Sequence, residues 1–221
     1  MRYDRAMRRL AALAAVSVLL TSCQGTVPRL NGQPESGISS VLIGCRMTLP
    51  TGETGSGRAA LNLEGQAGNT ESYRLPLEPQ RSLLYQVEPG LYRLSPTRSI
   101  FGFHHETLTA VVEGHSYSVP FPRDILRKPA VEIKPTKIVA LGVLDVSVER
   151  LPGREPTMRI YLDDSIDARR ALVQREIRSM MDPNAASDQR ASAISWTRAL
   201  EESLRTLVTE SQRGPAYRPG Q

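Results

Sequence analysis

The chain has 221 residues, 40% of them hydrophobic, and a formal net charge of +5. This length suits one sizeable domain, or one domain with an appendage. With three phenylalanines and one tryptophan, it has no basic stretch interleaved with aromatic residues, so we expect no nucleic-acid partner.

The first 22 residues combine a positively charged head with a short apolar stretch. Four arginines precede the apolar residues 10–20, and the small residues Thr21 and Ser22 lead to Cys23. As a helix, this apolar stretch would be about 16 Å long, which is too short for a hydrocarbon core of about 30 Å. The pattern therefore predicts a secretory signal peptide over residues 1–22 and not a membrane span.

The motif Leu20-Thr21-Ser22-Cys23 resembles the lipobox of bacterial lipoproteins. The resemblance implies cleavage before Cys23 and acylation of this cysteine, which would anchor the mature chain in a lipid bilayer. Gln24 stands where the best-known sorting system has aspartate for retention in the inner membrane, so we expect the outer membrane, with the domain facing the periplasm. The alternative is a cleaved signal followed by an incidental cysteine.

Removal of the signal changes the charge and the cysteine count. Without residues 1–22, 24 basic and 22 acidic residues remain, a net charge of +2. If Cys23 carries lipid, Cys45 has no partner for a disulfide within the chain. Cys45 lies in an alternating apolar segment, and this context predicts a buried thiol.

Residues 23–37 are predicted to form a lipidated flexible tether. The segment after Cys23 is polar, contains Pro28 and Pro34, and has no periodic apolar pattern. As a flexible coil it would hold the domain on the order of 20 Å from the acylated cysteine, and about 45 Å when fully stretched.

Residues 38–163 show period-two alternation, which is typical of half-buried antiparallel strands. About eight to ten short strands at this spacing predict a mainly β fold with an antiparallel β-sandwich. Around Gly142 the apolar positions change parity, which predicts a bulge. The expected strands are 41–47, 59–63, 73–77, 83–87, 92–94, 108–112, 117–119, 131–133, 138–148 and 158–162.

Two glycine turns are followed by tyrosine-containing strands. Pro89-Gly90 predicts a type II turn that reverses the chain between two strands, and Gly114 predicts a second turn. Together with Tyr92 and Tyr117, these turns resemble the transthyretin-like, peptidase-regulatory-like β-sandwiches found in many bacterial lipoproteins. The resemblance covers about residues 36–163 and implies a scaffold role for both tyrosines.

Residues 164–211 change to helical spacing and predict a helical hairpin or arm of two amphipathic helices. Asp163 or Asp164 is expected to cap the first helix. The second helix has an apolar stripe that packs on the chain's own sheet or contacts an envelope protein, because tryptophan is enriched in interfaces. Residues 212–221 are expected to be a disordered tail. The candidate partner contacts are Trp196, Leu200 and Leu204.

The sequence has few side chains in an arrangement that suits catalysis or metal binding. His104, His105 and Glu106 precede Glu113 and His115, and a cross-strand metal site is geometrically possible. Their spacing matches no recurring zinc motif, so we expect no metal, no cofactor and no catalytic residues.

The sequence therefore predicts a membrane-anchored lipoprotein that acts as a non-enzymatic structural or assembly module of the bacterial cell envelope. A partner would contact the C-terminal helices. One alternative is a module that binds envelope polysaccharide or a small ligand through loops 52–57 and 98–106. Another is a metal-dependent hydrolase.

Overall fold

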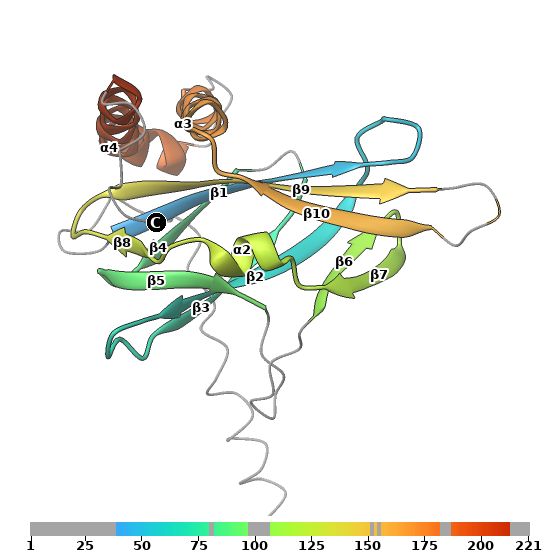
Figure 1. Cartoon of the computed structure of the whole chain (residues 1–221). Coiled ribbons are helices and arrows are strands. Elements are labelled where there is room, and N and C mark those ends of the chain that lie inside the picture. The colour runs from blue at the N-terminus through green and yellow to red at the C-terminus, as the bar shows by residue number, and fades with distance from the viewer. Residues whose placement is uncertain are drawn as a thin grey trace, which may run out of the picture.

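The described part of the chain forms two stacked β-sheets, and two C-terminal helices pack on one of them (Figure 1). The computed structural model describes residues 39–79, 82–96, 107–150, 153, 156–181 and 187–212. The predicted signal peptide, tether and nearly all of the predicted tail lie outside the described residues. The prediction of a β-sandwich followed by two C-terminal helices is confirmed.

The first sheet, sheet A, is continuous in the order β10-β9-β1-β4. Its two central strands, β1 and β9, are parallel, whereas the outer strands pair antiparallel with them. The parallel pair means that β1 and β9 begin at one end of the sandwich and finish at the other. The strands are β1 (Ser39–Thr48), β4 (Ser82–Val87), β9 (Ile138–Glu149) and β10 (Thr157–Asp163).

The second sheet, sheet B, has the order β7-β6-β2-β5-β8, and β3 also pairs with β2. Its strands are β2 (Gly57–Gly65), β3 (Ser72–Leu77), β5 (Gly90–Ser95), β6 (Thr107–Val112), β7 (His115–Pro120) and β8 (Val131–Ile133). The short helix α2 (Arg123–Arg127) follows β7 and buries Ile125 completely. The sequence did not predict α2, because five residues are too few to show a helical period.

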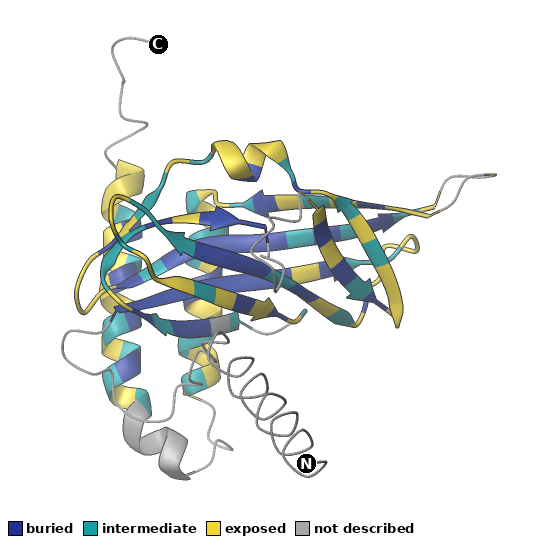
Figure 2. Ribbon diagram, turned by 90° about the horizontal axis from the view of Figure 1, so that it is seen from below, coloured by how far each residue is buried: buried dark blue, intermediate teal, exposed yellow. Residues whose placement is uncertain are grey.

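Alternation along the strands builds the core between the sheets. On β1, Val41, Ile43, Cys45 and Met47 all point into this core. Leu42 points to the other side of sheet A and is also buried, because the helices cover that side. Buried residues therefore run along the strands of both sheets in Figure 2.

A bulge at Gly142 changes which side chains of β9 face the core. Leu42 on β1 pairs with Ala140 on β9, but its neighbour Ile43 pairs with Gly142. One residue of β9 therefore has no partner on β1. Gly142 has φ +123°, a conformation that is essentially restricted to glycine. The parity change in the sequence predicted this bulge, and the prediction is confirmed.

The predicted hairpin turn at Pro89-Gly90 is wrong. Strand β4 belongs to sheet A and β5 to sheet B, so the chain crosses between the sheets here. Gly90 does not have a positive φ, as a type II turn would require. A Cβ at Gly90 would lie 2.4 Å from Nδ2 of Asn69, so a larger residue here would require the Asn69 side chain to move.

The helical layer consists of α3 (Ile166–Met180) and α4 (Ser187–Gln212). The predicted cap by Asp163 or Asp164 is wrong: the hydroxyl of Ser165 accepts a hydrogen bond from the Ala168 N–H at 3.2 Å. Asp163 supports this cap, because its Oδ1 accepts a hydrogen bond from the Ser165 N–H at 3.1 Å. None of the described helices is both long enough and apolar enough to cross a membrane.

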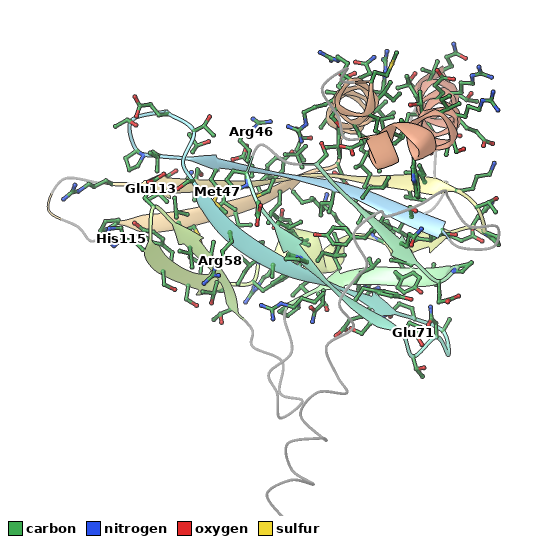
Figure 3. The ribbon with its side chains drawn as sticks, turned by 180° about the vertical axis from the view of Figure 1, so that it is seen from behind. Arg46, Met47, Arg58, Glu71, Glu113 and His115 are labelled. Carbon is green, nitrogen blue, oxygen red and sulfur yellow. The ribbon has the colours of Figure 1, made fainter. Side chains whose placement is uncertain are left out.

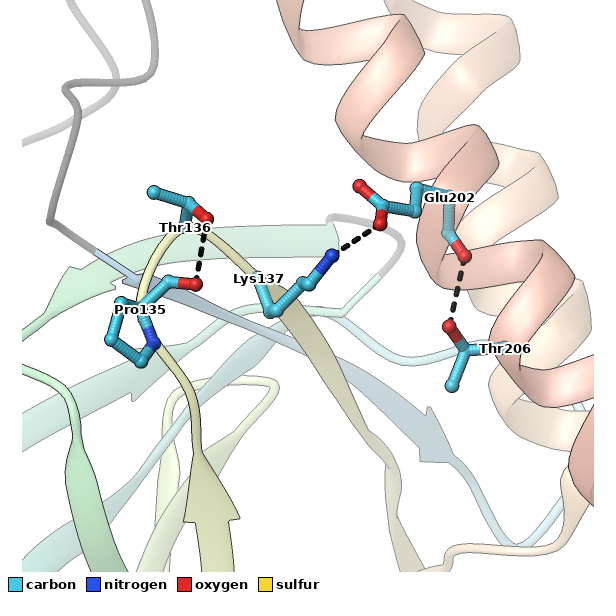
Figure 4. A network of polar contacts seen from close by, with 5 residues as sticks. All are labelled: Pro135, Thr136, Lys137, Glu202 and Thr206. Atoms are coloured by element: carbon cyan, nitrogen blue, oxygen red, sulfur yellow. Dashed lines mark hydrogen bonds and ion pairs between the residues drawn. The ribbon is translucent and has the colours of Figure 1, made fainter.

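Both helices pack on the outer face of sheet A. Lys137, just before β9, pairs with Glu202 of α4 at this interface (Figure 4), whereas Arg169 of α3 pairs with Glu210 of α4 at 3.2 Å and joins the two helices to each other. The buried apolar residues between the helices and the sheet are Leu42, Leu84, Ile138, Ala140, Val143, Leu172, Val173, Trp196, Leu200 and Leu207.

Candidate functional site

A cleft opens at the end of the sandwich where β1 and β9 finish. Its volume is about 340 Å³, at the lower end of the usual range for small-molecule sites. Figure 3 shows Glu113 and His115 at this end, away from α3 and α4. We call it the distal cleft, and its lining residues are Leu49, Pro50, Val112, Glu113, His115, Tyr117, Val148, Arg150 and Pro156.

A tight turn between β6 and β7 forms one wall of the cleft. Glu113 (φ +49°) and Gly114 (φ +79°) both have positive φ, as a type I′ turn requires, and Val112 pairs with His115 across it. The Glu113 N–H donates to the carbonyl oxygen of Ser56 at 3.0 Å, and the Ser56 N–H donates to Glu113 Oε1 at 2.6 Å. These two hydrogen bonds fix the turn to the loop between β1 and β2.

The cleft combines an apolar floor with a polar rim. Val112 and Val148 are buried core residues, and Tyr117 is half-buried. Three exposed side chains with different chemistry stand around them: the carboxylate of Glu113, the imidazole of His115 and the guanidinium of Arg150. This arrangement suits a ligand with an apolar group and hydrogen-bonding groups beside it.

Of the three predicted candidate metal ligands, only His115 falls within the described residues. It is exposed on β7, beside the cleft. His104 and His105 lie outside the described residues, so the metal site stays untested. Within the described part of the chain, no three His, Cys, Asp or Glu side chains form a group that could hold a metal ion.

Cys45 is buried in the core, as its alternating context predicted. Its side chain is 2% exposed. Burial, with a smaller effect of the nearby Asp145 charge, raises the pKa of the Cys45 thiol to about 12. Since the thiolate is the nucleophilic form, this cysteine is chemically inert. Cys23, the predicted lipidation site, lies outside the described residues.

The predicted partner contacts on α4 are corrected by the structure. Trp196 is 3% exposed and Leu200 is fully buried, both against the chain's own sheet. Leu204 is partly buried against the same cluster. The interpretation that the stripe packs on the chain itself is therefore the one that fits, and any partner of the helical layer must contact its outer face.

A smaller cavity of about 160 Å³ lies beside α2, between the edges of the two sheets. Lys128 and Asp164 line it and pair with each other at 2.7 Å. Arg169 also lines the cavity and pairs with Glu210. Because these charges are all paired and the volume is below the usual range for ligand sites, the distal cleft is the better candidate.

Glu176 on α3 is expected to make the stability of the protein depend on pH. Burial raises its pKa, although the Ser82 hydroxyl and the Arg175 charge act in the opposite direction. A carboxyl whose pKa is raised on folding stabilises the folded state at low pH, and this contribution is lost as the pH rises through the folded-state pKa. We therefore expect Glu176→Gln to be more stable than the wild type at about pH 7, with a smaller difference at about pH 4.

Urea unfolding at the two pH values measures this difference. Glu201→Gln is the matched control, because it removes one carboxylate from an exposed position on α4. If the Glu176→Gln difference were the same at both pH values, the role of Glu176 would be contradicted.

Comparison with known proteins found no protein-family model and no curated protein sequence that matches the chain. The lipoprotein and transthyretin-like resemblances therefore stay predictions from the motifs that carry them. The function of the chain has to be inferred from those motifs, the fold and the distal cleft.

Proposed function

We propose that the chain is a lipid-anchored protein of the bacterial cell envelope and that it acts as a structural or assembly module, by binding and not by catalysis. The lipobox-like motif at Leu20–Cys23 is the observation that carries the proposal. Only residues 24–38 separate Cys23 from Ser39, where β1 begins. A sandwich held this close to an acylated cysteine would work at a membrane surface.

The direction of β1 supports an orientation for the anchored domain. The tether joins β1 at Ser39, whereas the distal cleft lies where β1 ends. Ten residues of strand at about 3.3 Å each separate the two ends by about 30 Å. The cleft would therefore be offered to a partner at the end of the domain away from the lipid attachment.

The C-terminal helices can contribute a second contact with an envelope protein. Because Trp196 and Leu200 are buried, this contact would use the outer face of α3 and α4. Ile194 and Met181 remain exposed in this layer, at 65% and 68%. We propose the outer membrane as the site of action, facing the periplasm, from the Gln24 position after the lipobox.

Mass spectrometry of the protein purified from bacterial membranes tests the proposed anchor. The expected species begins at Cys23, lacks residues 1–22 and carries the additional mass of acyl chains on its first residue. A chain that keeps residues 1–22, or one that begins elsewhere without lipid, would rule the proposed anchor out.

A second candidate function is binding of an envelope polysaccharide or a small ligand. One observation favours it: Tyr117, His115 and Glu113 line the same cleft. A tyrosine ring with hydrogen-bonding groups beside it suits a sugar. Thermal shift with cell-wall glycan fragments tests this candidate, and a rise in melting temperature would support it.

A further inference from the structure

The strand β7 has an edge that no described strand occupies. It is the last strand of sheet B and pairs only with β6. Strand β10 of sheet A lies beside it but does not pair with it. An unpaired edge presents backbone N–H and C=O groups that can pair with another extended chain.

The turn geometry fixes which backbone groups of β7 face this edge. Across a two-residue type I′ turn, Val112 and His115 form a hydrogen-bonded pair. Such pairs alternate with non-hydrogen-bonded pairs along an antiparallel ladder. Ser116 and Ser118, opposite Val111 and Thr109, therefore turn their N–H and C=O groups away from β6 and toward the free edge.

The β3 and β10 edges of the sandwich carry features that discourage strand addition, and the β7 edge, like the β4 edge, lacks them. Strand β3 has Pro76 next to its last residue, and β10 carries Arg159 and Asp163. Charges and prolines are common protections of edge strands. Between His115 and Pro120, β7 has no charged residue and no proline.

The distal cleft opens next to the same strand. His115 and Tyr117, two residues apart, lie on the face of β7 that lines the cleft, and the exposed Ser116 and Ser118 lie on the opposite face. A chain added to β7 would also alternate its side chains and would direct every second one toward this face. A free edge with a side-chain pocket beside it is the recurring arrangement for recognising an extended peptide.

The composition of the cleft favours a peptide over a sugar. Its floor and much of its wall are apolar, with Leu49, Val112 and Val148 among the lining residues. On the rim, the negative charge of Glu113 and the positive charge of Arg150 sum to zero. An uncharged segment with an apolar side chain matches both properties.

We propose that β7 and the distal cleft bind an extended, uncharged peptide segment of an envelope protein. The segment pairs with Ser116 and Ser118 through its backbone and places an apolar side chain in the cleft. This inference rests on the proposed function, because it names the kind of partner that the anchored module holds.

Selection from a library of random eight-residue peptides tests the inference on the full-length protein, purified in detergent. The selected peptides are expected to carry apolar residues at alternate positions. Hydrogen exchange is expected to show that a bound peptide slows exchange at the Ser116 and Ser118 amides. Both results follow from strand addition at the β7 edge.

Ser118→Pro and Ser118→Ala form a matched pair of variants. Proline removes an N–H that β6 does not use, so we expect it to weaken peptide binding by about tenfold or more. Alanine keeps that N–H, so we expect less than about a twofold change. Equal effects of the two substitutions would overturn backbone pairing.

A chemical variant of the peptide keeps the test valid if Ser118→Pro fails to fold. N-methyl groups on the alternate amides that face β7 are expected to abolish binding, whereas methyl groups on the other set leave it intact. The inference is overturned if no peptide is selected, or if both sets of methyl groups act alike. It is also overturned if the protein binds cell-wall glycan fragments and not peptides. These outcomes do not depend on lipid at Cys23, so failure here is distinct from failure of the proposed anchor.

Discussion

Gly142→Ala is expected to lower the free energy of unfolding by about 3 kcal/mol or more. The alanine Cβ would lie 2.3 Å from the backbone oxygen of Asp163 and 3.0 Å from Cα of Asp164. These atoms belong to the backbone that leads from β10 into α3, so they cannot rotate away as a side chain can. The φ of +123° is also unsuited to alanine. Urea unfolding measures the loss.

Gly68→Ala is the control for Gly142→Ala. Gly68 also has a positive φ, +89°, but a Cβ there would meet no atom within 4 Å. Its substitution should cost about 1 kcal/mol, because only the backbone conformation is strained. If both variants lost the same free energy of unfolding, the close approach of Asp163 to Gly142 would not contribute to the loss in Gly142→Ala.

Leu200→Ala is expected to destabilise the protein by about 3 kcal/mol. Leu200 is fully buried between α4 and sheet A, next to Trp196 and Leu207. Its truncation removes apolar contacts and leaves a cavity under the helical layer. Hydrogen exchange should rise most in α3 and α4, because this layer depends on the cluster, whereas the core between the sheets keeps its own contacts.

Ile194→Ala serves as the matched substitution on the same helix. Ile194 is 65% exposed, so its loss should change stability by less than about 0.5 kcal/mol. If Leu200→Ala were as mild as Ile194→Ala, α4 would not be packed on the sheet. The stripe that contains Trp196 would then again need a partner.

The sequence predicted the strands well because successive side chains of a strand point to opposite faces of the sheet, which makes apolar residues alternate along the chain. Val41, Ile43, Cys45 and Met47 alternate in the chain and point into the same core. The bulge was also visible, since the extra residue at Gly142 shifts this alternation by one position. Both features are local, so a few neighbouring residues are enough to predict them.

The pairing of strands was not predictable in the same way. Pro89-Gly90 indicates that a strand ends. The same two residues can begin either a hairpin turn or a crossing between sheets, so they do not show which of the two follows. The parallel pairing of β1 with β9 joins segments about 100 residues apart. The tertiary structure, and not the local pattern, decides such contacts.

The candidate site was predicted only in pieces. The sequence indicated Glu113 and His115 together as candidate metal ligands, and Tyr117 as a scaffold residue. Val148 and Arg150 complete the cleft from the end of β9, and nothing in their own sequence context indicates a shared site. For Trp196, the sequence could show an apolar stripe but not which surface covers it.

Fractionation of cells that carry Cys23→Ser tests the proposed lipid anchor. We expect the wild-type protein in the membrane fraction, whereas the variant is released in soluble form with the same melting temperature. The equal melting temperature is expected because Cys23 lies before β1, outside the sandwich. A Cys23→Ser variant that remains fully bound to membranes would contradict anchoring through an acylated Cys23.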